Sequence, residues 1–419
     1  QWEARHQGMS RLDRAGCAYN AYLPDPLGGW NMAIPADIAA DIADAESAIK
    51  SLNDAGTQHV SLEGLARFLL RAESVGSSKI EGLSAASRRL AKAEVALALG
   101  GDPADRIAVE ILGNIAAMES AIDMASEASE FCMEDLLSIH RTLMDRSSNA
   151  EFGGKLRQEQ NWIGGSSYNP CSAAFIPPPH EYLEKLLADL IEYINGDAHS
   201  PLVQAAVAHA QFETLHPFAD GNGRTGRAVI HIVLRRRGLA PKFVPPISLI
   251  LATWSDDYVT GLTNFRHLGE RDSEERSAAA ALWLRTFAAA ARRSCIDAGH
   301  YSEEIAKTNA EWRKAIGSVR AKSSTDLLLQ ILPGAPIVTA ESASALIGRS
   351  KARTTDAINS LVKAGVLKQS NKGRKRDRVF EASRILDLFT GLERALASPS
   401  GDTLAAPPIR EVPRRPTEE

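Results

Sequence analysis

The feature that most constrains this chain is a twelve-residue string from His216 to Arg227, HPFADGNGRTGR. Apolar residues at helical spacing precede the string, and a second such set follows Gly223. This pattern predicts two helices joined by a tight turn. Gly221 and Gly223 allow backbone conformations that other residues avoid. Because the N–H groups of a helix N-terminus point outward, the turn should form an anion-binding site.

The charged residues of the string suit phosphate chemistry. Arg224 and Arg227 lie three positions apart and should share one face of the second helix. Two guanidinium groups beside outward N–H groups can bind a polyphosphate. Asp220 supplies the carboxylate oxygen that a phosphate-bound Mg²⁺ favours, and His216 can accept a proton near neutral pH. The string therefore predicts a phosphoryl- or nucleotidyl-transfer site.

The remaining sequence predicts a mainly α-helical fold. Helical spacing of apolar residues begins at Ala36 and predicts a run of helices through residue 145, with a break near Gly100–Pro103. The character changes between Arg157 and Pro179, and helices resume at Glu181. Two short strands, at 161–165 and 174–177, should form a hairpin. We expect five regions. They are an N-terminal helical region (1–110), a catalytic core (111–300), a helical connector (301–322), a winged helix-turn-helix domain (323–396) and a disordered tail (397–419).

Composition excludes several classes of protein. The chain is 44% hydrophobic and 24% charged with a net charge of −4, so it is neither wholly disordered nor uniformly basic. Four cysteines, Cys17, Cys132, Cys171 and Cys295, lie far apart, which argues against a zinc knot or a disulfide framework. No segment has the apolar length of a membrane span or signal peptide. These observations favour a cytoplasmic protein.

The string resembles the core motif of the Fic family, H-x-F-x-[D/E]-G-N-G-R-x-x-R, at every fixed position. The resemblance implies a protein adenylyltransferase that moves AMP from ATP to a Ser, Thr or Tyr hydroxyl, including its own, and releases pyrophosphate. His216 would be the catalytic base and Asp220 the Mg²⁺ ligand. The resemblance assigns ATP binding to Gly221, Asn222, Gly223, Arg224, Thr225, Gly226 and Arg227. Relatives that act as kinases carry Lys at the position of Gly223, so glycine favours AMP transfer.

Two further segments resemble parts of the same family. Residues 157–179 are similar to the β-hairpin flap, in which Asn161, Ile163 and Gly164 would contact the nucleotide. The exposed edge of a flap can align an extended target segment by strand addition. Relatives carry two adjacent tyrosines in the adenine pocket, where this chain has Asp257 and Tyr258. Only Tyr258 matches that pattern.

A third segment is similar to the family's inhibitory helix, [S/T]-x-x-x-E-[G/N], at Ser77, Glu81 and Gly82. In relatives the glutamate pairs with the second arginine of the motif and blocks the γ-phosphate. A carboxylate bound to Arg227 would compete with phosphate for the same guanidinium. A glutamate in this place could instead orient a water that removes AMP, so a hydrolase is an alternative function.

The C-terminal unit has the pattern of a winged helix, with three helices and two strands. The helices are predicted at 324–331, 339–347 and 350–364, and the strands at 366–368 and 378–380. Residues 349–378 hold ten Lys or Arg against two Asp, which suits contact with a DNA backbone. A second hypothesis is therefore a DNA-binding regulator that uses the Fic core as a nucleotide sensor. The module could also serve as a homodimer or target-docking surface. The partners considered are a protein substrate, including the chain itself, DNA bound through the winged helix, and a second copy in a homodimer, but no membrane.

Overall fold

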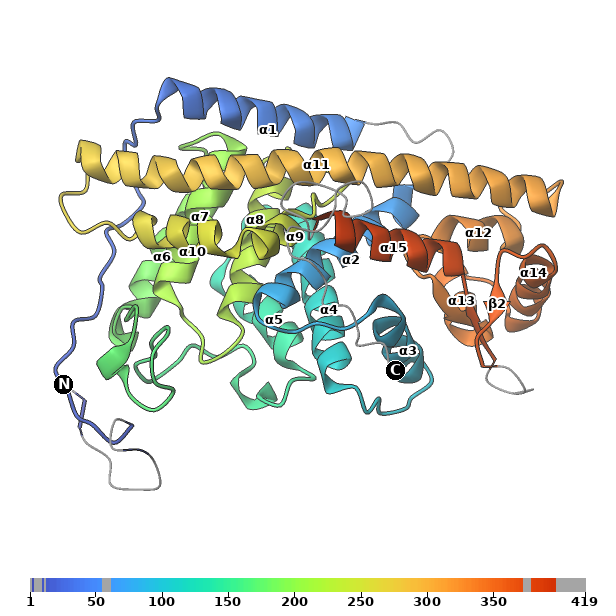
Figure 1. Ribbon diagram of the computed structural model, residues 1–419, viewed down its shortest axis with the longest axis horizontal. Coiled ribbons are helices and arrows are strands. Elements are labelled where there is room, and N and C mark those ends of the chain that lie inside the picture. The colour runs from blue at the N-terminus through green and yellow to red at the C-terminus, as the bar shows by residue number, and fades with distance from the viewer. Residues whose placement is uncertain (1, 4–9, 11–12, 55–61, 372–377, 397–419) are drawn as a thin grey trace, which may run out of the picture.

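The computed structural model describes residues 2–3, 10, 13–54, 62–371 and 378–396, and Figure 1 shows its arrangement. The described chain is mainly helical, with one small antiparallel sheet. The helices before the C-terminal unit are α1 (Ala36–Asp54), α2 (Leu62–Ile80), α3 (Ser87–Ala98), α4 (Arg106–Glu127), α5 (Met133–Met144), α6 (Leu183–Asn195), α7 (Pro201–Leu215), α8 (Asn222–Arg236), α9 (Ile247–Thr253), α10 (Ser255–Phe265) and α11 (Glu274–Ile316). Single 3₁₀ turns lie at η1 (Ala150–Phe152), η2 (Pro170–Ser172) and η3 (His180–Tyr182).

Helices α7 and α8 form the centre of the bundle and confirm the two helices predicted around the string. Nearly every residue of α7 is buried, because small and apolar side chains surround the helix on all sides. The two helices approach closely at Gly226, where a Cβ atom would lie 2.5 Å from Glu213 Oε1 and 2.8 Å from the Phe212 ring. Any larger side chain at Gly226 would push the helices apart. The loop between them is therefore anchored in the core.

Helix α11 spans the whole molecule, with α1 packed along it (Figure 1). It runs without a break through residue 300, where the sequence predicted a boundary between core and connector. The other boundary predicted within the helical body, at residue 110, likewise falls inside a continuous helix, α4. The first part of the helix contains the Ala-rich stretch 278–291. None of the described helices is long and apolar enough to cross a bilayer.

The C-terminal unit contains α12 (Ser324–Ile331), β1 (Ile337–Thr339), α13 (Ala340–Ile347), α14 (Lys351–Lys363), β2 (Lys368–Gln369), β3 (Val379–Glu381) and α15 (Ser383–Leu396). The strands pair antiparallel in the order β1-β3-β2, with Val338 opposite Phe380. The three predicted helices and two predicted strands are confirmed, whereas β1 and α15 were not predicted. The basic loop 372–377 and the tail 397–419 lie outside the described residues.

This unit packs directly on α2, the helix that precedes Glu81. A Cβ atom at Gly64 would lie 2.3 Å from the Gln330 carbonyl oxygen, and the rings of Phe68 and Phe389 meet edge to face at 5.4 Å. Helices α3 and α11 also contact the unit. The C-terminal unit is therefore joined to the helical body through several elements rather than by α11 alone.

Candidate active site

The loop between α7 and α8 begins at His216, which ends α7 in a left-handed conformation (φ 47°). Its N–H donates to the Phe212 carbonyl oxygen at 2.9 Å. Its own carbonyl oxygen accepts hydrogen bonds from Arg157 Nε at 2.9 Å and Asn161 Nδ2 at 3.2 Å. A non-glycine residue in this backbone region is strained, and these donors hold it there. Arg157 was not predicted as a site residue.

The half-buried imidazole of His216 is neutral near pH 7. Burial, followed by the charges of Arg266 and Arg157, lowers the pKa of His216 to about 4. Its Nδ1 atom is buried and has no hydrogen-bond partner among the described residues. An imidazole that is neutral has a free lone pair and can accept a proton. The ring therefore has the protonation state that a general base needs.

The middle of the loop is fixed by Phe218 and Asn222. The Phe218 ring is fully buried and stacks on the His140 ring with centroids 3.7 Å apart. The Asn222 side chain accepts from the Phe218 N–H and donates to the Phe218 carbonyl oxygen, both at 2.8 Å. Asn222 thus closes the loop, and any anion contact it makes would come from its backbone.

Asp220 is held by two residues that sequence reasoning missed. Asn149 Nδ2 donates to Asp220 Oδ2 at 2.8 Å, and His140 Nε2 lies 2.9 Å from the Asp220 carbonyl oxygen. The Gly154 N–H donates to His140 Nδ1 at 3.0 Å, so the ring proton must lie on Nε2 and point at Asp220. No spacing rule connects these positions to the string, because they come from α5 and the turn that follows it.

Arg224 is a buried cation whose two ion pairs are long. Its guanidinium lies 3.8 Å from Asp220 and 3.9 Å from Glu110, and its buried Nε and Nη1 atoms make no hydrogen bond within the described part of the chain. Burying such a group is costly unless an anion pairs with it. The side chain stands in the first turn of α8, where backbone N–H groups also lack intrahelical partners. The position is prepared for a negatively charged ligand.

Arg227 is already paired. Its Nη2 donates to Glu81 Oε1 at 2.7 Å and to the Ser77 carbonyl oxygen at 2.8 Å, while Nε donates to Ser77 Oγ at 2.9 Å. Burial tends to raise the pKa of Glu81, but the charge and hydrogen bond of Arg227 outweigh it and lower that pKa. A Cβ atom at Gly223 would lie 2.0 Å from Glu81 Oε1, so glycine makes room for this carboxylate.

Comparison with known proteins agrees with this geometry. Residues 130–234 match the Fic/DOC family model, and residues 39–123 match the model of the Fic/DOC family N-terminal region. These parts of the chain are therefore similar to the two regions of that family. The contact between Glu81 and Arg227 therefore joins the two matched regions.

Curated relatives match the same part of the chain. Protein adenylyltransferase fic-1 of Caenorhabditis briggsae is 31% identical over 141 residues, which are 32% of this chain and 26% of that protein. Protein adenylyltransferase Fic of Drosophila erecta is 33% identical over 139 residues, with the same coverage of both chains. The chain thus spans about a quarter of the length of these relatives. A Fic family protein from Desulfovibrio desulfuricans G20 shares the fold, with a TM-score of 0.50 at 20% identity over 84% of this chain and 97% of that one.

The flap of the Fic domain is shorter than the sequence predicted. Instead of two strands, a single antiparallel bridge joins Ile163 and Phe175, with Ile163 N–H donating to the Phe175 carbonyl oxygen at 2.8 Å. Gly164 and Gly165 both have left-handed backbones (φ 75° and 74°), which turn the first strand away from its partner. Asn161 Nδ2 donates to the carbonyl oxygens of His216 and Phe218, so the flap is attached to the loop.

Tyr258, predicted to line the base pocket of the Fic domain, is buried in the core. Its hydroxyl lies 2.9 Å from His209 Nε2 on α7, and its ring packs against Trp283. Base binding by Tyr258 stays a prediction. The neighbouring carboxyl of Glu213 is also buried, and burial raises the pKa of Glu213 to about 7.

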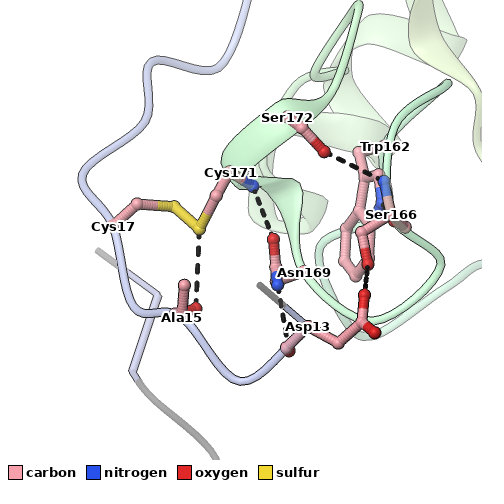
Figure 2. Close-up of a disulfide and its surroundings, with 8 residues drawn as sticks. All are labelled: Asp13, Ala15, Cys17, Trp162, Ser166, Asn169, Cys171 and Ser172. Atoms are coloured by element: carbon pink, nitrogen blue, oxygen red, sulfur yellow. Dashed lines mark hydrogen bonds between the residues drawn. A yellow bond between two sulfur atoms is a disulfide. The ribbon is translucent and has the colours of Figure 1, made fainter. Parts of the chain in front are cut away.

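A disulfide joins Cys17 to Cys171 beside the flap, although the wide spacing of the cysteines had argued against a disulfide framework. Their Cα atoms lie 5.7 Å apart although 154 positions separate them in the sequence. Spacing in the sequence could not reveal the pair, because tertiary structure alone brings the two residues together. Figure 2 shows the pair and the residues around it.

Proposed function

We propose that this chain is a protein adenylyltransferase, which transfers AMP from ATP to a Ser, Thr or Tyr hydroxyl and releases pyrophosphate. The observation that carries the proposal is the buried guanidinium of Arg224 at the N-terminus of α8. Its ion pairs with Asp220 and Glu110 are long, and its Nε and Nη1 atoms make no hydrogen bond within the described residues, so an anion could bind there. The α- and β-phosphates of ATP would supply that anion. The names of the relatives that match the Fic domain agree with this proposal.

His216 would act on the incoming hydroxyl. The neutral imidazole accepts the hydroxyl proton, and the hydroxyl oxygen forms a bond to the α-phosphorus. The bond from the α-phosphorus to the bridging oxygen breaks, and pyrophosphate leaves. Arg224 and the N–H groups of the loop stabilise the charge that develops on the phosphate oxygens. Catalysis would then rest mainly on positioning and on charge.

The residues around Asp220 fit a phosphate-bound Mg²⁺. The Asp220 carboxylate is oriented by hydrogen bonds from Asn149 Nδ2 and the Gly221 N–H. One such carboxylate is enough for Mg²⁺ when phosphates and water supply its other ligands. Within the described residues no group of three His, Cys, Asp or Glu side chains could hold a metal without a nucleotide. Asp220 would hold the ion, which neutralises phosphate charge. His140 and Asn149 would keep Asp220 in place.

Glu81 would inhibit this activity in the resting chain. It takes the hydrogen-bonding position on Arg227 that a γ-phosphate would need. With Arg227 engaged, ATP would bind without its γ-phosphate fixed, and the α-phosphorus would be poorly aligned for attack. A hydrolase that removes AMP is the alternative, since the part-exposed carboxylate of Glu81 could orient a water.

The proposed function is tested with ATP labelled at one phosphate at a time. Label at the α-phosphate should appear on the Glu81→Gly protein, whereas label at the γ-phosphate should not. Transfer of the γ-label would identify a kinase. No transfer of either label would contradict the proposal and favour a hydrolase or a nucleotide-sensing regulator. Release of AMP from a pre-labelled protein by the wild-type chain would identify the hydrolase.

We also propose that the C-terminal unit is a winged helix that contacts DNA. The element order α12-β1-α13-α14-β2-β3 and the sheet order β1-β3-β2 support this proposal. Helix α14 exposes Lys351, Arg353 and Lys363. A basic helix of this kind could lie in a groove of the duplex and contact its phosphates.

The DNA proposal predicts a salt-dependent gel shift with random duplex. The double variant Lys351→Ala, Arg353→Ala should weaken binding, with a salt slope lower by about 2. The exposed Lys185 lies on α6, at the opposite end of the molecule, so Lys185→Ala is the matched control and should bind like the wild type (Figure 1). If the wild-type chain binds no duplex at low salt, the unit does not serve as a DNA contact.

A further inference from the structure

The segment before α1 lies along the flap and is covalently joined to it. We propose that Cys17 and Cys171 form a thiol–disulfide exchange site that controls the outer edge of the flap. In the oxidised state the disulfide fixes residues 13–22, called here the strap, on that edge. Reduction by a dithiol releases the strap. The consequence for target binding rests on the proposed function, whereas the release itself does not.

The strap contacts the turn of the flap through side chains on both partners (Figure 2). Ser166 Oγ donates to Asp13 Oδ1 at 2.7 Å, and Asn169 Nδ2 donates to the Asp13 carbonyl oxygen at 2.9 Å. Trp2, paired with the backbone of Cys17, places its ring 5.2 Å from that of Trp162. The strap therefore covers the side of the flap turn that carries Cys171.

The strap also occupies a backbone edge. Phe175 directs its N–H and carbonyl groups toward Ile163, so the neighbouring Ile176 directs its own groups outward. The Tyr22 N–H donates to the outward carbonyl oxygen of Ile176 at 2.9 Å. An extended target segment that adds to this edge would need the same acceptor. The strap and such a segment therefore exclude each other.

The part of the chain that follows the strap is fixed independently. Asp25 forms an ion pair with Arg276, and the Leu27 N–H donates to Asp189 Oδ2 at 2.7 Å. The Trp30 ring is buried in the core. Loss of the disulfide would therefore free residues 13–22 while leaving α1 in place. Release is local, and the fold does not depend on it.

The pair is chemically accessible. Cys171 is exposed and Cys17 is half-buried, so a small dithiolate can attack the disulfide. The S–S bond breaks, the two cysteines take up two electrons and two protons as thiols, and the dithiol becomes a cyclic disulfide. Without the cross-link, the strap is held by hydrogen bonds, by the contact of Trp2 with Trp162, and by Tyr22. The Tyr22 hydroxyl donates to the His267 carbonyl oxygen at 3.1 Å, and its ring lies 5.8 Å from that of Phe175. Water competes for such bonds, so the strap would open more often.

The first test counts thiols and follows hydrogen exchange in the absence of nucleotide. The denatured wild-type protein should react with about two equivalents of a maleimide before reduction, from Cys132 and Cys295, and with about four afterwards. The Tyr22 amide should exchange about tenfold faster after dithiothreitol treatment. Cys17→Ser and Cys171→Ser should each reproduce that rate without reductant. Cys132→Ser, the matched control, should not change it.

Four reactive thiols in the untreated protein, or an exchange rate that reduction leaves unchanged, would overturn the proposal.

The second test measures AMP transfer by the Glu81→Gly chain to a His216→Ala copy as acceptor. Reduction should raise that rate several-fold by exposing the flap edge. Faster exchange with no rise in transfer would overturn the control of target binding. No transfer in either redox state would contradict the proposed function, and the thiol and exchange results would still decide on the strap.

Discussion

Replacing Glu81 with glycine should raise the rate of AMP transfer about tenfold to 100-fold. The carboxylate donates no proton to the reaction proposed here, and its main contact is a 2.7 Å ion pair with Arg227. A hydrogen bond between charged groups is worth about 1.5–3 kcal/mol, and each 1.36 kcal/mol corresponds to a factor of ten. The Glu81 side chain remains 39% exposed, so solvent screening favours the lower part of the range. The measurement is the initial rate of α-label incorporation at saturating Mg²⁺.

A matched control separates loss of the contact from a change in helix α2. Glu63 lies in the first turn of α2, is exposed, and pairs with Arg67 rather than with the loop. Glu63→Gly should therefore leave the transfer rate within about twofold of the wild type. If Glu81→Gly transfers AMP no faster than the wild type, Glu81 does not inhibit the enzyme. An equal increase in both variants would assign the effect to α2 as a whole.

The sequence predicted the local geometry of the site because one contiguous string carries it. Helical spacing on both sides of His216–Arg227 determined where α7 ends and α8 begins. The partner of Arg227 required more than local pattern, because 146 positions separate Glu81 from it. Only the resemblance to the inhibitory helix indicated Glu81. His140, Asn149 and Arg157 have no local signal, since each acts on the loop across a tertiary contact.

Outside the string, the spacing of apolar residues failed to predict several features of the fold. The sequence predicted a boundary at residue 300, next to Gly299, but a glycine within a helix costs only about 1 kcal/mol relative to alanine. Packing of α11 on α1 and α15 outweighs that cost. Strand β1 has three residues, too few for an alternating pattern, and exists because it pairs with β3. The disulfide at Cys17 depends on the same kind of long-range contact.

Replacing His216 with alanine in the Glu81→Gly protein should lower the transfer rate about 10²- to 10⁴-fold, the usual contribution of a general base. The alanine chain should still bind ATP, because Arg224 and the N–H groups of the loop do not depend on the imidazole. His300→Ala is the matched control, since this exposed histidine lies on α11, away from the loop. It should leave the rate unchanged. A loss below tenfold in His216→Ala would exclude His216 as the base.

The protonation of His216 adds a test that does not depend on turnover. Because burial lowers the pKa of His216 to about 4, the ring is neutral above that pH and gains a proton only as the pH falls through it. An ordinary histidine would already be half protonated near pH 6.5. The His216 ring resonances, identified in spectra by their loss in His216→Ala, should therefore stay constant from about pH 8 to 5 and shift only below that range. A transition near pH 6.5 would mean that the ring is hydrated and more exposed than its position between Arg157 and Arg266 indicates.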